Sequence, residues 1–103
     1  MGGTGKSILV EYLISCLKDK YKLATLSRGY GRSSKGFIIA EKNSLPTEVG
    51  DEPFQFLNNH PEIKVTVCEN RRIGVEKIKT KLPEINLIIF DDLMQHRWVK
   101  SDF

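Results

Sequence analysis

The sequence predicts an α/β fold in which helices flank a sheet of parallel strands. Short apolar runs alternate along the chain with helical patterns, which is typical of such sheets. A glycine-rich stretch, GGTGKS at residues 2–7, stands where the first helical pattern begins. An apolar strand pattern at residues 86–90 ends in two aspartates. Together these observations indicate a P-loop NTPase-like, three-layer architecture.

Length and composition are those of a globular domain. The chain has 103 residues, which suits one modest domain, and no repeat or linker divides it. Hydrophobic residues make up 40% and charged residues 28%, which excludes disordered and collagen-like classes. The formal net charge is only +3 and the basic residues are dispersed, so we expect no nucleic-acid partner.

The sequence also bears on the cellular compartment. No apolar run approaches the ~18 residues that span a bilayer, and no secretory signal is visible. We therefore expect these residues by themselves to be soluble and cytoplasmic. Cys16 and Cys68 lack C-x-x-C or metal-ligand spacing, and we interpret both as reduced core residues.

The first half of the chain predicts one helix and two strands. Apolar residues recur at helical spacing over residues 6–20, and they form one expected face: Ile8, Leu9, Tyr12, Leu13, Cys16 and Leu17. A short buried strand follows at residues 23–27. Residues 28–36 are rich in Gly and Ser and predict a loop. A second short strand is expected at residues 37–40, and a polar connection then runs through Pro46.

A helix is expected over residues 52–59. Asp51 is a favourable N-cap, and Pro53 stands near the first helical position. His60 is interpreted as a residue that only ends this helix. Residues 64–68 alternate between polar and apolar side chains and predict a strand.

The remaining residues predict a helix and a central strand. The helix covers residues 70–81, and its expected apolar positions are Ile73, Val75 and Ile78. Residues 86–90 are apolar on both faces, which suits a strand in the middle of a parallel sheet. The tail at residues 98–103 predicts no further element.

The glycine-rich stretch matches the end of the phosphate-loop pattern G-x-x-x-x-G-K-[ST], whose first glycine would precede Met1. Glycines let backbone N–H groups approach phosphate oxygens, and the following helix directs its positive end there. Lys6 suits the β- and γ-phosphates and Ser7 suits Mg²⁺. The alternative is a turn that caps a helix. The candidate nucleotide-binding residues are Gly2, Gly3, Thr4, Gly5, Lys6 and Ser7.

Asp91 and Asp92 follow the apolar strand directly. P-loop enzymes commonly hold Mg²⁺ with an aspartate at the end of such a strand. Solvated acids at a strand end are the alternative, and the nearby phosphate loop favours the metal site. The residues alone do not decide which of the two carboxylates contacts the metal.

Three further stretches give the sequence a family resemblance. They are LSRGYGR at residues 26–32, VGDEP at residues 49–53 and DDLMQHR at residues 91–97. Together with GGTGKS, and in this order, they resemble the tetraacyldisaccharide 4'-kinase family over nearly the whole chain. That family uses ATP to phosphorylate the 4'-hydroxyl of a tetraacyldisaccharide 1-phosphate, a lipid A precursor.

The resemblance implies roles for individual residues. Lys6 would be the phosphate-loop lysine, and Asp51 would be the catalytic aspartate that accepts the proton of the sugar hydroxyl. Asp91 and Asp92 would be the acidic pair near Mg²⁺, together with Ser7.

The same resemblance adds candidate phosphate contacts. Gln95 and His96 match the family's Gln-His near the metal and the phosphates. Arg28 and Arg32 fall in the family's glycine-rich loop, where a solvated loop is the alternative. Leu93 departs from the small residue that is usual there, and it would either crowd the metal site or turn into the core.

The resemblance further implies that residues 1–103 are a partial P-loop kinase domain, truncated at both ends. The family has a membrane-associating N-terminal segment, a strand before the phosphate loop and a C-terminal portion. The full-length protein is therefore expected at the cytoplasmic face of the bacterial inner membrane. Without these parts an apolar sheet edge would lie open, and the chain alone would be marginally stable and inactive.

Two other functions are compatible with parts of the sequence. GGTGKS alone allows a P-loop ATPase of the switch or partitioning type that acts as an interaction module. SRGYGR and VGDEP argue against that class. A non-enzymatic remnant that binds no nucleotide is the other alternative.

Overall fold

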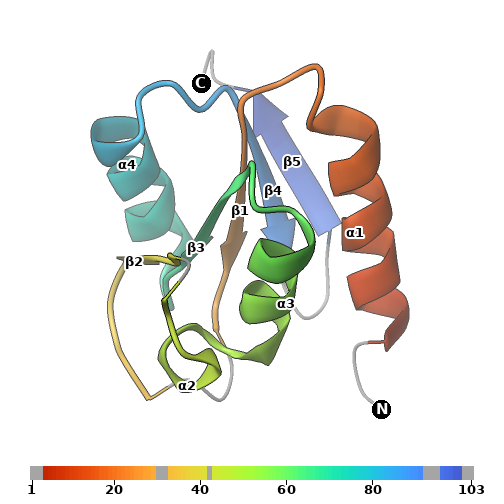
Figure 1. Ribbon diagram of the computed structural model, residues 1–103. Coiled ribbons are helices and arrows are strands. Elements are labelled where there is room, and N and C mark those ends of the chain that lie inside the picture. The colour runs from red at the N-terminus through yellow and green to blue at the C-terminus, as the bar shows by residue number, and fades with distance from the viewer. Residues whose placement is uncertain (1–3, 30–32, 42, 92–95, 101–103) are drawn as a thin grey trace.

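The computed structural model describes residues 4–29, 33–41, 43–91 and 96–100. Figure 1 shows a central sheet with α4 on one face and with α1 and α3 on the other, which confirms the predicted three-layer α/β architecture. The elements in chain order are α1 (Thr4–Leu17), β1 (Leu23–Ser27), β2 (Ile38–Ile39), α2 (Pro46–Val49), α3 (Asp51–Asn59), β3 (Lys64–Val67), α4 (Arg71–Lys81), β4 (Leu87–Asp91) and β5 (His96–Lys100).

The sheet has the strand order β2-β3-β1-β4-β5. The central strand β1 pairs in parallel with β3 on one side and with β4 on the other. Both edge strands are antiparallel, because β2 pairs with β3 and β5 pairs with β4 in that sense. The parallel sheet expected from the sequence is thus confirmed for the three central strands only.

A reciprocal polar pair joins the starts of β1 and β4. The Lys22 N–H donates to Asn86 Oδ1 at 2.9 Å, and the Asn86 N–H donates to the Lys22 carbonyl at 2.9 Å. In the resulting register Ser27 lies opposite Asp91. Because β4 is apolar on both faces, hydrophobicity alone does not select this register, and the polar pair supplies the missing specification.

Two apolar clusters fill the space on the two faces of the sheet. The cluster under α1, α2 and α3 consists of Val10, Ile14, Leu23, Ala40, Val49, Phe56, Leu57, Ile63, Val65, Val67, Leu87 and Ile89. The cluster under α4 consists of Ala24, Leu26, Cys68, Ile78, Ile85, Ile88 and Phe90. Strand side chains alternate between faces, so Ser27 and Asp91 lie on the face that α1 covers.

Helix α1 differs from its predicted form. It covers Thr4–Leu17, and its buried positions are Val10 and Ile14, with Leu13 and Leu17 partly buried. The predicted apolar face was wrong in part, because Leu9 is 44% and Tyr12 64% exposed. The helix carries apolar residues around most of its circumference, so spacing alone did not identify the face that packs.

Two elements appear where the sequence predicted none. The tail was expected to lack a further element, but His96–Lys100 form β5 along the outer edge of β4. The strand-forming residues Trp98 and Val99 can pair with backbone groups of β4 that would otherwise lack partners. The second element, α2, begins at Pro46, which has a backbone φ suited to a first helical turn.

Single-residue expectations also had mixed outcomes. Both cysteines are free, and Cys68 is buried as expected, but Cys16 is exposed on α1. Ile73 was expected to be apolar core and is 48% exposed. The residues of α4 that are buried against the sheet are Gly74 and Ile78, one turn apart, and Ile73 is rotated away from that line.

Candidate functional site

The carboxyl ends of the three parallel strands meet at one edge of the sheet. Figure 1 shows that α1, α3 and α4 begin at this same edge, the lower one in the view. Ligands of open parallel α/β sheets bind outside this edge, where helix N-termini supply partial positive charge.

Asp91 closes β4 and is only 5% exposed. Its register neighbours are Ser27 on β1 and His96 on β5. The alternation of strand side chains puts Asp91 on the face covered by α1, and the first turn of α1 contains Lys6 and Ser7. The strand-end carboxylate and the helix that follows the glycines thus belong to the same face and the same edge.

Asp51 is the first residue of α3 and is exposed. The expectation that Asp51 is the N-cap was wrong, because Gly50 takes that position with φ 97° and ψ 154°. Gly50 also ends α2, where its N–H donates to the Pro46 carbonyl at 2.7 Å. A junction between two helices requires this backbone conformation, which glycine alone adopts readily.

The loop after β1 is attached to α2. Arg28 follows β1 directly and is exposed. Further along, the Ser33 N–H donates to the Thr47 carbonyl at 2.5 Å, and the Ser34 hydroxyl donates to the Glu48 carbonyl. Since α2 leads through Gly50 into Asp51, the structure brings this loop next to the segment that carries Asp51.

Several predicted site residues lie outside the described residues: Gly2, Gly3, Arg32, Asp92 and Gln95, together with Leu93. Thr4 and Gly5 form the start of α1. Among the described residues there is no cluster of three or more His, Cys, Asp or Glu side chains that could hold a metal ion. In that same part of the chain, no helix is long and apolar enough to cross a membrane.

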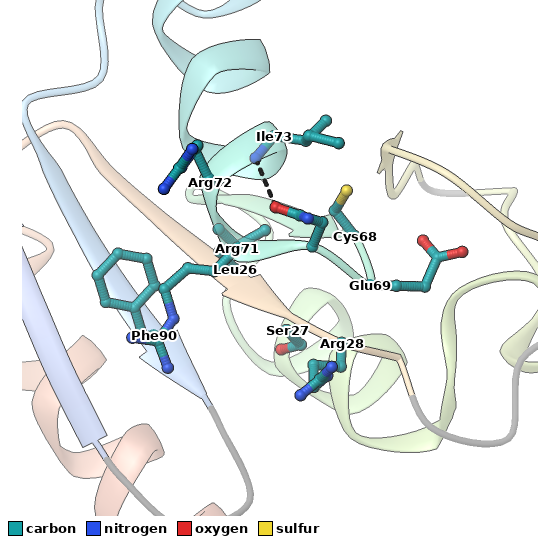
Figure 2. A pocket seen from close by; sticks show the side chains of 10 residues that line it. Leu26, Ser27, Arg28, Cys68, Glu69, Arg71, Arg72, Ile73 and Phe90 are labelled. Carbon is teal, nitrogen blue, oxygen red and sulfur yellow. Dashed lines mark hydrogen bonds between the residues drawn. The ribbon is translucent and has the colours of Figure 1, made fainter.

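Sequence reasoning missed a cavity at this edge of the sheet. Figure 2 shows the cavity, which has a volume of about 770 Å³. Its lining residues are Leu26, Ser27, Arg28, Cys68, Glu69, Asn70, Arg71, Arg72, Ile73 and Phe90. Of these, Arg28 alone was predicted from the sequence to be a site residue. The available signal was Asn70-Arg71-Arg72, a helix cap followed by two cations directly after a strand that ends at this edge.

The fold and the site define a class of protein. A parallel sheet whose first helix begins within GGTGKS, with a buried aspartate closing a strand on the same face, is a P-loop NTPase-like domain. The family model described as LpxK, tetraacyldisaccharide-1-P 4'-kinase, matches residues 1–103. The chain belongs to the tetraacyldisaccharide 4'-kinase family, which decides against a partitioning-type ATPase.

Individual relatives agree with the family model. The chain is 48% identical over 103 residues to the tetraacyldisaccharide 4'-kinase of Flavobacterium psychrophilum, covering 100% of the chain and 30% of that protein. It is 45% identical over 101 residues to that of Bacteroides thetaiotaomicron, covering 97% of the chain and 27% of that protein. The chain therefore spans about 30% of the length of such relatives.

A solved structure has the same fold. The crystal structure of LpxK from Aquifex aeolicus in complex with ATP superposes with a TM-score of 0.76 at 37% sequence identity. The match covers 92% of this chain and 31% of that one. The likeness extends to most of the elements described above.

Proposed function

We propose that this chain provides the nucleotide- and metal-binding part of a kinase. The kinase transfers the γ-phosphate of ATP to the 4'-hydroxyl of a tetraacyldisaccharide 1-phosphate, a step of lipid A biosynthesis. The observation that carries the proposal is the position of Asp91, a buried carboxylate at the strand-end edge on the face of α1. Residues 1–103 are, in this proposal, part of one P-loop kinase domain.

The first turn of α1 and the glycines before it hold the nucleotide phosphates. Backbone N–H groups of the glycine-rich stretch would donate hydrogen bonds to the phosphate oxygens, and Lys6 would add a positive charge near the β- and γ-phosphates. The Ser7 hydroxyl and the carboxylates of Asp91 and Asp92 are the hard oxygen ligands that Mg²⁺ prefers. When bound, Mg²⁺ would neutralise negative charge on the phosphate groups of ATP during transfer of the γ-phosphate.

Asp51 serves as the base for the acceptor hydroxyl. Its exposure leaves it accessible to a sugar, and it stands in the first turn of α3. It accepts the proton of the 4'-hydroxyl as that oxygen attacks the γ-phosphorus, and the bond between the γ-phosphorus and the bridging oxygen breaks to release ADP. His96, beside Asp91 in the sheet, contributes with Gln95 near the metal and phosphates, while Arg28 and Arg32 supply positive charge.

The substrate class suggests where the whole protein works. A tetraacylated disaccharide is held in a membrane, so the enzyme associates with the cytoplasmic face of the bacterial inner membrane, where ATP is present. The acceptor is a lipid-linked sugar, and no nucleic acid takes part.

Thermal unfolding with and without Mg-ATP tests the nucleotide site. A ligand at about 100 times its Kd stabilises the folded state by ~2.7 kcal/mol, so we expect Tm to rise by several degrees. Lys6→Ala abolishes this rise, and Asp51→Asn retains it, because the base does not bind the nucleotide. Lys77→Ala, an exposed position on α4, is the matched control. An unchanged Tm, or an equal rise in Lys6→Ala, would contradict the proposal.

A further inference from the structure

The cavity at the carboxyl ends of β1, β3 and β4, called the strand-end cavity below, is electropositive. Three arginines line it, Arg28, Arg71 and Arg72, against one carboxylate, Glu69. The Glu69 carboxylate accepts hydrogen bonds from the Gly36 N–H at 2.9 and 3.2 Å, so it is engaged with the segment before β2. The lining side chains therefore carry a net positive charge that suits a dianion.

Arg71 is held against the wall of the cavity. Its Cζ lies 5.0 Å from the centroid of the Phe90 ring, which is a cation–π distance, and Phe90 is 5% exposed. Figure 2 shows the Arg71 side chain alongside Phe90 and the Arg28 side chain at the end of β1. Two guanidinium groups from different elements thus border one space.

The first turn of α4 adds backbone donors to the cavity. Asn70 caps the helix, and its Oδ1 accepts from the Ile73 N–H at 3.0 Å, the dashed line in Figure 2. The Arg72 N–H stands in the first turn, where no helical carbonyl can accept it. Gly74 lets this turn approach the sheet closely, since a Cβ there would lie 2.8 Å from Leu26 Cδ1.

Ser27 borders the cavity at the end of β1, and its side chain lies on the face that α1 covers. Ser27 is 4% exposed, and its Oγ makes no hydrogen bond to any of the described residues. Ser27 is also the register neighbour of Asp91, which links the cavity to the proposed metal site.

We propose that the strand-end cavity binds a phosphate monoester group, with Arg28, Arg71 and the first turn of α4 as its donors. Arginine pairs with phosphate through two parallel hydrogen bonds, and a helix N-terminus favours the same anion. The volume of about 770 Å³ accommodates a phosphate with a sugar attached. This inference rests on the proposed function, whose reactants offer two such groups: the sugar phosphate of the acceptor and the nucleotide phosphates.

Amide chemical shifts of the ¹⁵N-labelled 103-residue chain test the proposal. We expect glucosamine 1-phosphate and inorganic phosphate to shift the amides of Arg72 and Ile73 in a saturable way. Arg71→Gln weakens this binding about tenfold or more, because a charged hydrogen-bond donor is lost. Glu69→Gln strengthens it a few-fold, because Glu69 is the one carboxylate among the described lining residues and the substitution removes its charge. Lys77→Gln, on the same helix but outside the cavity, leaves it unchanged.

The same spectra identify the source of the phosphate and separate the two proposals. Shifts of the α4 amides by Mg-ATP that disappear in Lys6→Ala assign the site to a nucleotide phosphate. Shifts by glucosamine 1-phosphate that persist in Lys6→Ala assign it to the acceptor. If Mg-ATP shifts Gly5 and Lys6 but neither phosphate ligand shifts Arg72 or Ile73, the cavity proposal is overturned and the nucleotide site stands.

Two further outcomes bear on the cavity alone. Equal weakening by Arg71→Gln and Lys77→Gln would overturn the proposal, since it would indicate a general charge effect. If Arg71→Gln perturbs the whole spectrum, the exposed Arg28→Gln takes its place, with the same weakening expected. A response of α4 to sugar phosphate without any response to Mg-ATP would support the cavity and count against the proposed function.

Discussion

His60 shows how a single polar residue links two distant segments. It is 6% exposed, and its ring lies between Lys18 Nζ, 3.4 Å from Nδ1, and Glu11 Oε1, 2.6 Å from Nε2. A lysine only donates, so Nδ1 is the acceptor and Nε2 carries the proton that Glu11 accepts. Lys18 also pairs with Glu62 at 2.5 Å, and this hydrogen bond lowers the pKa of the Glu62 carboxyl.

Removing the His60 ring should therefore destabilise the protein. We expect His60→Ala to lower the free energy of unfolding by about 2 kcal/mol, because a buried ring and two hydrogen bonds are lost. Urea denaturation at neutral pH measures the change. Asn58→Ala, exposed and nearby on α3, is the control and should change stability by less than about 0.5 kcal/mol. Equal effects of the two substitutions would show that the hydrogen bonds of His60 do not contribute to the free energy of unfolding.

The sequence interpretation of His60 was incomplete for a physical reason. The residue does end α3, where it is the C-cap, as expected. Its partners Glu11 and Lys18, however, are 49 and 42 residues away in sequence. Local patterns describe how a residue ends a helix but not which helix packs on it, so burial at this position could not be predicted.

At the scale of elements, the junction between α2 and α3 depends on one backbone conformation. Gly50 has φ 97° and ψ 154°, a region that other residues enter at a cost of ~1–3 kcal/mol. We expect Gly50→Ala to destabilise the protein by about 2 kcal/mol in urea denaturation. Gln55→Ala, exposed on α3, should be nearly neutral. A neutral Gly50→Ala would mean that the junction relaxes easily and does not fix Asp51.

The contact between α4 and β1 depends on a second glycine. A Cβ at Gly74 would lie 2.8 and 2.9 Å from the two methyl groups of Leu26, which is 2% exposed, and 3.3 Å from Cys68 Cβ. Overpacking costs ~1–3 kcal/mol, and the higher helix propensity of alanine returns about 1. We expect Gly74→Ala to lose about 1 kcal/mol in the parent and to be neutral or stabilising in Leu26→Ala. The same change in both backgrounds would exclude this steric origin.

Element prediction succeeded where the pattern was distinctive. The strands at residues 23–27, 64–67 and 87–91 lie within one residue of their expected ends, because each is a buried run bounded by polar or turn residues. Of the two edge strands, β2 was predicted at residues 37–40 and forms over Ile38–Ile39, whereas β5 was not predicted. The sequence of β5 has no apolar run, and its pairing depends on an available edge of β4, which is a property of the assembled sheet.

At the scale of the whole molecule, protection should be greatest at the centre of the sheet. β1 is hydrogen-bonded on both sides, to β3 and β4, whereas β2 is a two-residue edge strand. In native-state hydrogen exchange we expect the amides of β1 to exchange at the global unfolding limit. Those of Ile38 and Ile39 should exchange about a hundredfold faster or more. Equal rates in β1 and β2 would contradict a stability gradient across the sheet.

The candidate site was partly predictable because parallel strands collect distant segments at one edge. Asp91 and Arg28 could be expected there, since each follows or closes an apolar strand. The strand-end cavity was not predictable in the same way. In the sequence, Arg71 and Arg72 have the pattern of ordinary solvent-exposed cations on a helix. The close approach of α4 to the sheet at Gly74 brings them beside Ser27 and Phe90.

The amide of Asn86 has an effect well beyond its own position. It fixes how β4 slides along β1, and a shift by one residue would exchange the two faces of β4. Phe90 would then lie on the face that Asp91 occupies. Asp91 is five residues, or about 17 Å along the strand, from the Asn86 amide. Hydrophobic burial alone would not oppose such a slip, because β4 is buried and apolar on both faces. The hydrogen bond of Asn86 at the start of β4 therefore determines the face on which Asp91 lies at the end of the strand.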